Sequence, residues 1–378
     1  MGMANFDKVI KLNSDDATKV TSSAYGANKN QIAAAMIMKV WLMDVITDTW
    51  GSVPYSDISK LESDNVLYCK YDDQKDIYAG MIKDLTTAVN MIDASKSAFT
   101  SGDVIFGGDA SKWKKFGNSL KCRLAIHLSK VDTNWKSYIA EALNSGVMQS
   151  KDDAAKFTYS SAGSDYCQFY DGFFTDGRND LTIANPLVDI MKGQRDTLNN
   201  KQHPWEGTLD PRLSVYTTPN DAGVYQGIPY ATPTGTQEKF SESAPDWYST
   251  KPMVVQKTYA VPLMTYAELK FILCEYNGYD VADYKDGVEA SLKYWYDLAG
   301  KSISNTTIDS YVNAVSGNVN AETCALQKYI DLYTNGTEAW TEIRRTGYPE
   351  QLIRPGEITC VYNGNKVAFT DRKSTRLN

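Results

Sequence analysis

The stretch that most constrains the fold is residues 31–47, which is apolar on nearly every side when it is drawn as a helix. Its apolar residues leave little room for a polar face: Ile32, Met36, Ile37, Val40, Trp41, Leu42, Val45 and Ile46. A helix that is hydrophobic all round must be covered by other elements over most of its surface. The chain is therefore expected to build a helical core around this segment.

Apolar residues at three-and-four spacing predict further helices along the chain. In the N-terminal part these cover residues 74–93, 111–131 and 134–145. Asp109 or Ser111 is expected to cap the second of them, and Gly146 to end the third. In the C-terminal part the pattern predicts helices over residues 263–277, 284–299, 321–333 and 337–345. Short connections between helices favour antiparallel helical hairpins, so we expect an all-α fold.

The region between Met148 and Pro262 has a different character. Nine of the 12 prolines lie from Pro186 to Pro262, among Gly, Asn, Asp and aromatic residues. A stretch this long with little periodicity is typical of functional loops, and its aromatic content argues against disorder. We therefore expect one domain over residues 1–378, with a helical scaffold at about 31–147 and 263–349 and a loop-rich, ligand-facing region at about 148–262.

Composition narrows the classes of function. The net charge is −7 and Lys and Arg do not cluster, so the electrostatic footprint of a nucleic-acid-binding protein is missing. The six cysteines show neither a CxxC pair nor metal-ligand spacing, and are interpreted as core residues. Tyrosine, with 25 residues against 11 Phe, is unusually common, which favours surfaces where a flat apolar face carries a polar tip. Sugar-binding surfaces have this character.

Four segments together resemble one family. They read "MDVITDTWGSVPYSD", "GGDASKWKKFGNSLKCRLAIHLS", "MTYAELKFILCEYNGY" and "EAWTEIRRTGYPE", and they span Ala33 to Pro349 in the family's order. They are similar to the signature motifs of SusD/RagB-type proteins, the surface nutrient-binding lipoproteins of Bacteroidetes. The chain is expected to be truncated at both ends, because the family's lipoprotein signal and its C-terminal segment are not recognised here.

The resemblance implies a helical-hairpin (TPR-like) repeat scaffold with a long irregular insertion. It also implies that the protein captures a nutrient, most often an oligosaccharide, at the outer membrane. Its partner would be a SusC-like TonB-dependent transporter, over which it acts as a lid. Contact with the membrane would come only through a lipid anchor that is absent from this chain. No cofactor and no catalytic residue is implied.

The charged residues of the motifs are interpreted as structural. Glu268 and Glu275 are seven residues apart, roughly 10.5 Å along a helix. This slightly exceeds the separation of about 5–9.5 Å between the paired carboxylates of glycosidases. Both lie in a nearly all-apolar segment, where a carboxylate must be paired. Candidate partners are Arg123, Arg344 and Arg345, and we expect at least one of the two glutamates to contact one of them.

Histidine gives little support for a metal site. His127 lies on or beside an apolar helix face, where a packed and hydrogen-bonded imidazole is the more common role. His203 has no second His or Cys at metal-ligand spacing, and the chain lacks an HExxH motif. The sequence therefore predicts no metal site.

The ligand-contact candidates all lie in the loop-rich region. The stretch "SDYCQFYDGFFTDGRND" combines aromatic rings with polar groups for sugar hydroxyls, and Trp205 and Trp247 are loop tryptophans with polar neighbours. The set comprises Trp205, Trp247, Tyr248, Tyr170, Phe173, Arg178 and Asn179. The competing interpretation is that most of these aromatic residues cover a small hydrophobic core within the loop-rich region itself.

The corner "DVITDTWGSVPYSD" is predicted to be scaffold. Asp48 is expected to accept backbone N–H bonds from the turn, as in an Asx-turn, and Gly51 to allow the chain to reverse. Pro54 would fix the exit of the turn. Trp50 is expected to pack the turn against neighbouring helices.

Two other functions stay open. A helical-repeat adaptor that binds a peptide or protein would show a continuous concave groove lined by helix residues. An all-helical glycoside hydrolase would need two carboxylates that face each other across a cleft. A sugar-binding protein should instead show a short platform of aromatic rings on its loops.

Overall fold

The computed structural model describes residues 2–58, 68–162, 165–176, 183–220, 222–229 and 256–369, without the side chains of Phe173 and Tyr362. The chain divides into two compact units. Unit 1 comprises residues 1–157, 262–277 and 334–345, and unit 2 comprises residues 158–261, 278–333 and 346–378. The expectation of one domain over the whole chain stays a prediction.

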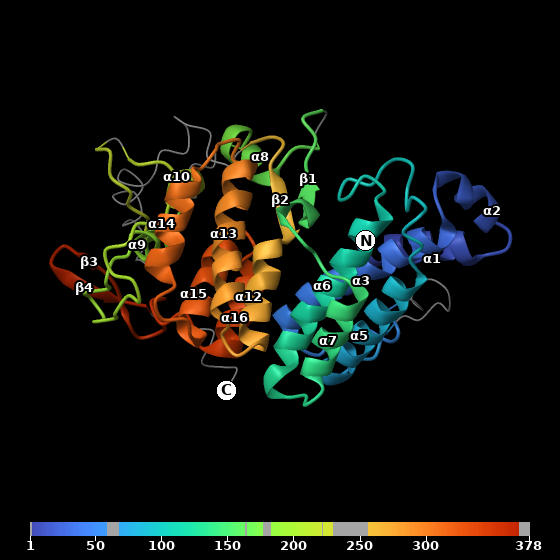
Figure 1. Cartoon of the computed structure of the whole chain (residues 1–378), viewed down its shortest axis with the longest axis horizontal. Coiled ribbons are helices and arrows are strands. Elements are labelled where there is room, and N and C mark those ends of the chain that lie inside the picture. Colours follow the sequence, from blue (N-terminus) through green and yellow to red (C-terminus); the bar gives the residue numbers. More distant parts are fainter. Residues whose placement is uncertain are drawn as a thin grey trace. The chain divides into compact units, whose positions relative to one another are not determined.

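Unit 1 is built mainly from helices, several of which pack against α3 (Figure 1). Its helices are α1 (Gly2–Ser14), α2 (Lys19–Ser22), α3 (Asn28–Trp50), α5 (Gln74–Met91), α6 (Ala110–His127), α7 (Trp135–Ser145), α12 (Tyr266–Tyr276) and α16 (Gly336–Thr346), with short 3₁₀ segments at Ser23–Tyr25, Leu128–Lys130 and Lys151–Asp153. Strands β1 (Ala155–Thr158) and β2 (Ala260–Met264) form a two-stranded sheet.

The central position of α3 is confirmed, since it contacts α1, α5 and α6. Ile37 and Val40 are buried against apolar residues of α5 and α6. Towards the C-terminal end of α3 the most buried positions become polar, namely Asp44, Thr47 and Asp48. A buried carboxylate needs partners, so this end of the helix must meet polar groups from elsewhere in the chain.

Helix ends follow the predicted signals in unit 1. The Asp109 carboxylate accepts a hydrogen bond from the backbone N–H of Lys112 and caps α6. Gly146, with a φ of 101°, ends α7. The predicted start of a helix at residue 263 is wrong, because residues 260–264 form β2 and Thr265 caps α12 through the backbone N–H of Glu268.

Unit 2 contains α8 (Gln168–Phe174), α9 (Asn185–Met191), α10 (Leu213–Tyr216), α13 (Val281–Leu298), α14 (Asn305–Val315) and α15 (Ala321–Asp331). Strands β3 (Ile358–Tyr362) and β4 (Asn365–Ala368) form an antiparallel hairpin. The positive φ angles of Asn363 (49°) and Gly364 (79°) suit the tight turn between these strands. The predicted all-α class is confirmed, because the described residues are mostly helical and their strands are short.

Helices α3, α5 and α6 pack tightly at Gly117. A Cβ atom at Gly117 would lie 2.7 Å from Cγ1 of Val89 and 2.9 Å from Cδ1 of Ile37. Both neighbours are apolar side chains of the core, where extra methyl groups force side chains out of their preferred rotamers.

We expect Gly117→Ala to lower the free energy of unfolding by up to about 2 kcal/mol, because an overpacking cost of about 1–3 kcal/mol opposes a gain in helix propensity of about 1 kcal/mol. Gly172→Ala in α8 is the matched control, since its Cβ would meet no atom within 4 Å. The measurement is urea unfolding followed by circular dichroism. Equal stability changes in the two variants would contradict the close packing at Gly117.

Candidate functional sites

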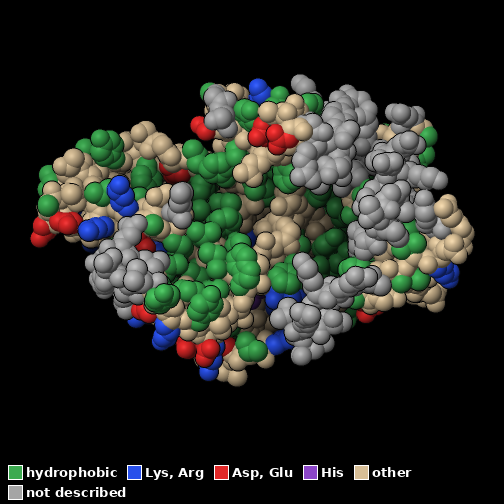
Figure 2. Space-filling view, turned by 180° about the vertical axis from the view of Figure 1, so that it is seen from behind, with side chains coloured by type: hydrophobic (Ala, Val, Ile, Leu, Met, Phe, Trp, Pro, Cys, Tyr) green, Lys and Arg blue, Asp and Glu red, His purple; other side chains and the backbone are tan. Residues whose placement is uncertain are grey.

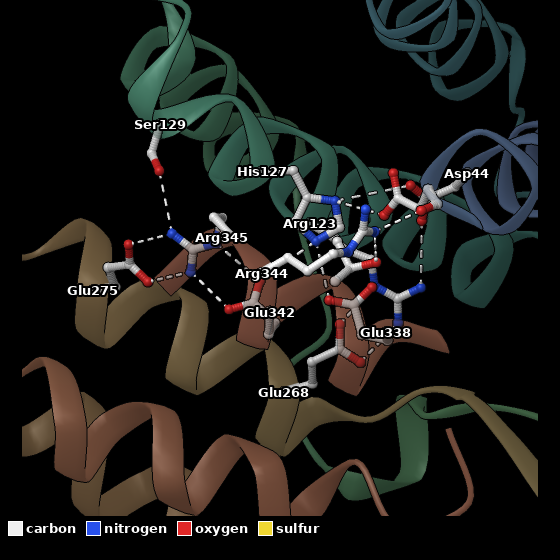
Figure 3. Close-up of polar contacts among 12 residues, drawn as sticks. Asp44, Arg123, His127, Ser129, Glu268, Glu275, Glu338, Glu342, Arg344 and Arg345 are labelled. Carbon is white, nitrogen blue, oxygen red and sulfur yellow. Dashed lines mark hydrogen bonds and ion pairs between the residues drawn. The ribbon is translucent and has the colours of Figure 1, made fainter. Parts of the chain in front are cut away.

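Four helices of unit 1 bring charged side chains into one buried cluster (Figure 3). Each helix contributes residues spaced by about one or two turns, which places them on the same face. The contributors are Asp44 and Asp48 from α3, Arg123 and His127 from α6, Glu268 and Glu275 from α12, and Glu338, Glu342, Arg344 and Arg345 from α16.

Arg123 lies at the centre of this cluster and is 1% exposed. Its Nε and Nη2 donate to the two carboxylate oxygens of Glu268 at 2.6 and 2.7 Å, and Nη2 also donates to the carbonyl of Leu263 at 2.8 Å. Asp44 and Glu338 lie 3.9 and 3.6 Å from the guanidinium. Burial alone would lower the pKa of Arg123, but the charges of Glu268 and Glu338 raise it above its ordinary value.

Arg345 forms a second bidentate pair with Glu275, at 2.6 Å for each oxygen. The same guanidinium donates to Glu342 at 2.7 and 3.1 Å and to Ser129 at 3.2 Å. The predicted ion pairs of Glu268 and Glu275 with arginine are therefore confirmed. Arg344 takes a different role, since it donates to the carbonyl of Asp48 at 2.5 Å and stacks 3.8 Å from the centre of the Trp340 ring.

His127 lies between two pairs of carboxylates. Its Nε2 is 3.1 Å from Glu338 and 3.4 Å from Glu342, while its Nδ1 is 3.5 Å from Asp48 and 3.0 Å from the hydroxyl of Tyr78. Burial alone would lower the pKa of the imidazole, but these carboxylates, above all Glu338, raise it well above its ordinary value. The predicted packed and hydrogen-bonded imidazole is confirmed.

Asp44 is the carboxylate with the fewest partners in the cluster. Burial, reinforced by the charge of Asp48, raises its pKa well above the ordinary value. Its Oδ1 atom is buried and has no hydrogen-bond partner within the described residues. Such an atom is unusual in a folded protein and calls for a physical explanation.

A cavity of about 950 Å³ in unit 1 reaches this cluster. Asp48, Tyr78 and His127 line it, together with cationic residues that include Lys75, Lys130 and Arg344. Water and small ions can therefore approach His127 and Asp48 from this cavity.

The corner after α3 differs from the prediction in two respects. Asp48 does not form an Asx-turn, because its carboxylate accepts a hydrogen bond from Tyr78 at 2.5 Å and faces His127. Trp50 does not pack against neighbouring helices, since it is 70% exposed. Gly51 does allow the reversal, with a φ of 75°. Pro54 follows Val53, which forms an isolated bridge with Asp72 beside the turn.

Exposed apolar groups are not limited to the loops. Figure 2 shows hydrophobic side chains gathered on the face opposite to that of Figure 1. In unit 1 the side chains of Trp50 and Trp340 are 70% and 44% exposed. Exposure of an aromatic ring therefore does not by itself identify a ligand site in this chain.

Of the predicted ligand contacts, Trp205 and Tyr170 have described side chains. Trp205 is 7% exposed and lies edge-on to His203, so the expectation that polar sequence neighbours keep it at the surface is wrong. Phe173 belongs to α8, but its side chain is not described. Trp247, Tyr248, Arg178 and Asn179 lie outside the described residues. Contact of any of these residues with a ligand stays a prediction.

Tyr170 belongs to an aromatic cluster on and beside α8. Its ring centre is 5.5 Å from that of Tyr166 and 4.8 Å from that of Phe174. The ammonium of Lys257 lies 5.4 Å from the Tyr166 ring and 5.3 Å from the Tyr170 ring, within the range of cation–π attraction. Phe169 and Phe174 are 41% and 49% exposed. We call Tyr166, Phe169, Tyr170, Phe174 and Lys257 the α8 aromatic cluster.

The sequence analysis did not identify several residues that contact the charged cluster. Tyr78, Glu338 and Glu342 were not singled out, although the spacing of Glu338 and Glu342 by four residues in an amphipathic helix was a usable signal. In unit 2 it missed Arg212, which is fully buried. Arg212 forms a bidentate pair with Asp210, at 3.0 and 2.6 Å, and donates to Ser291 and Gln327.

The chain matches a family model and several solved structures. The family model of SusD-like proteins, described as "starch-binding associating with outer membrane", matches residues 1–368. A solved structure titled as a chitin-binding protein has 28% identity and a TM-score of 0.74, and the match covers 93% of this chain and 74% of that chain. No curated protein matches the chain.

Two further solved structures share the fold. A SusD homologue from Bacteroides uniformis has 22% identity and a TM-score of 0.71, with 92% of this chain and 73% of that chain covered. A SusD homologue from Flavobacterium johnsoniae, titled as chitin-binding, has 23% identity and a TM-score of 0.69, and the match covers 92% of this chain and 73% of that chain. Within the described residues, every helix is too short or too polar to cross a membrane.

Removing one partner of the ion pair between Arg123 and Glu268 should strongly destabilise the fold. Glu268→Gln leaves the Arg123 charge buried without its bidentate acceptor, so we expect the free energy of unfolding to fall by about 3–5 kcal/mol. Glu289→Gln is the control, because Glu289 pairs with Lys293 on an exposed face of α13 and such pairs contribute less than about 1 kcal/mol. Urea unfolding measures both, and a loss below about 1 kcal/mol for Glu268→Gln would contradict the central role of the pair.

The raised pKa of His127 predicts a dependence of stability on pH. Folding favours the protonated imidazole, so its contribution is complete below the unfolded pKa of about 6.5 and is lost as the pH rises through the folded pKa. We expect His127→Gln to be much less sensitive to alkaline pH than the wild type. Urea unfolding between neutral and alkaline pH, in buffer with a chelator, tests this. Parallel pH profiles for the two proteins would show that His127 is not charged in the cluster.

Proposed function

Because the chain belongs to the SusD-like family, described as starch-binding and associating with the outer membrane, we propose that it captures an oligosaccharide at the cell surface and delivers it to a TonB-dependent transporter. The family match over residues 1–368 is the observation that carries this proposal. The solved structure titled as chitin-binding, at 28% identity, supports a glycan as the ligand.

The α8 aromatic cluster is the proposed contact surface for the sugar. A sugar ring presents an apolar C–H face and a rim of hydroxyls, so it is bound by flat aromatic rings beside polar groups. The partly exposed rings of Phe169 and Phe174 offer such faces. Asp171 and Asp176, on and beside α8, and the Lys257 ammonium supply polar groups for hydroxyls.

The geometry of α12 argues for binding without turnover. Glu268 and Glu275 each accept two hydrogen bonds from an arginine, which engages both oxygens of each carboxylate. A glycosidase needs one carboxylic acid that can donate its proton to the leaving group. The hydrolase alternative therefore finds no support in this pair.

Delivery to a SusC-like transporter rests on the family's description as associated with the outer membrane. We propose that the protein is held there by a lipid anchor. Co-purification with a TonB-dependent barrel from outer membranes of the source organism tests this part separately. Recovery of the chain without such a barrel would remove the delivery step and leave glycan binding standing.

We expect isothermal calorimetry to detect binding of one class of glycan, from a panel that includes malto-oligosaccharides and chito-oligosaccharides. Tyr170→Ala should weaken this binding by roughly 5- to 30-fold, the equivalent of about 1–2 kcal/mol for loss of an aromatic anchor. Trp50→Ala is the control, because Trp50 is an exposed aromatic residue that belongs to unit 1. Tight binding of peptides with no glycan binding would favour the adaptor function instead.

A further inference from the structure

The charged cluster of unit 1 contains an acceptor atom that the protein itself does not use. Asp44 is 2% exposed, and its Oδ1 atom has no hydrogen-bond partner within the described residues. This atom faces Nδ1 of His127 at 3.9 Å. An unpaired buried carboxylate oxygen costs free energy, which a proton or a metal ion at this position would offset.

Three possible metal-ligand atoms, one each from Asp44, Asp48 and His127, lie close together here. Oδ2 of Asp48 lies 3.5 Å from Nδ1 of His127, and Asp44, Asp48 and His127 each offer one ligand atom within 4.8 Å of the others. Two ligands about 2.1 Å from a tetrahedral Zn²⁺ ion lie about 3.4 Å apart. The donors therefore need to move by less than about 1 Å to bind such an ion.

The surroundings orient these donors. His127 can donate its Nε2–H to Glu338 at 3.1 Å, which leaves Nδ1 available to a ligand. This is the carboxylate–histidine–metal arrangement in which an outer carboxylate fixes the tautomer of the ligand. The Nδ1 atom lies 3.0 Å from the Tyr78 hydroxyl, 3.5 Å from Asp48 and 3.9 Å from Asp44. Tyr78 donates to Oδ1 of Asp48 at 2.5 Å and leaves Oδ2 on the side of His127.

The opposite side of His127 is a weaker candidate. Glu338 and Glu342 also lie within ligand distance of the imidazole. However, Glu342 accepts two hydrogen bonds from Arg345, and Glu338 lies 3.6 Å from Arg123. A metal ion there would have to compete with the hydrogen bonds of Arg345 and with the charge of Arg123. Among the described guanidinium groups, Asp44 faces only that of Arg123, at 3.9 Å, which is beyond hydrogen-bond distance.

We propose that Asp44, Asp48 and His127 bind a divalent first-row metal ion of the Zn²⁺ class. One imidazole nitrogen and two carboxylates suit this class better than Ca²⁺, which takes six to eight oxygen ligands. Binding releases to solvent any proton held by Nδ1 of His127 or by the Asp44 carboxyl, because both must be deprotonated to act as ligands. The cavity lined by Asp48, Tyr78 and His127 provides the entry path and a water molecule for the fourth position.

The experiment measures metal binding by the whole chain without glycan. Chelator-treated protein is dialysed against ZnCl₂, and the bound metal is counted by atomic emission. We expect one Zn²⁺ per chain in the wild type and at least tenfold weaker binding in Asp44→Asn. The control is Asp132→Asn, because Asp132 lines the same cavity but does not belong to the group of three donors.

A second measurement does not depend on any variant. Co²⁺ bound to the wild type should show d–d absorption without the charge-transfer band of a cobalt–thiolate bond, and the Zn absorption edge should fit nitrogen and oxygen ligands that include an imidazole. Absence of bound metal in the wild type, equal binding by Asp44→Asn and Asp132→Asn, or a thiolate band would each overturn the proposal.

Discussion

The bidentate ion pair between Arg123 and Glu268 is the interaction on which unit 1 depends. It joins α6 to α12, whose paired residues are 145 positions apart in the sequence. Removing both charges from water costs several kcal/mol per ion, which the mutual attraction offsets only when the geometry is good and the remaining donors are used. The additional hydrogen bond from Arg123 to the carbonyl of Leu263 uses a third N–H of the guanidinium. The second pair, Arg345 with Glu275, then fixes α16 to the other end of α12.

Unit 2 uses the same solution with different residues. Arg212 is fully buried and its guanidinium is held by Asp210, with Ser291 and Gln327 accepting its remaining hydrogen bonds. Tyr311 donates to the same aspartate at 2.6 Å. Each unit therefore has its own buried arginine that is held by a bidentate carboxylate and by further acceptors. Because a displaced helix would leave such a charge unpaired, these arginines favour a single arrangement of the helices within each unit.

The parts of the fold that follow from local pattern could be predicted from the sequence. The Asp109 cap and the end of α7 at Gly146 follow from rules about nearby residues, and the pairing of the buried Glu268 follows from the cost of burying a charge. The helix α14 was missed, because its Thr, Val and Asn residues have low helix propensity and its core contacts come from tertiary packing.

The errors at the candidate sites have a different origin, because partners distant in the sequence decide exposure and pairing. Asp48 is bound by Tyr78, which is 30 positions away, and His127 by Glu338, which is 211 positions away. Neither spacing resembles a short motif, so no local turn or metal signature could reveal them. Trp205 was expected at the surface because its sequence neighbours are polar, yet it packs edge-on to His203. The proposed metal ligands were hidden for the same reason, since only the packing of α3 against α6 brings Asp44 and Asp48 to His127.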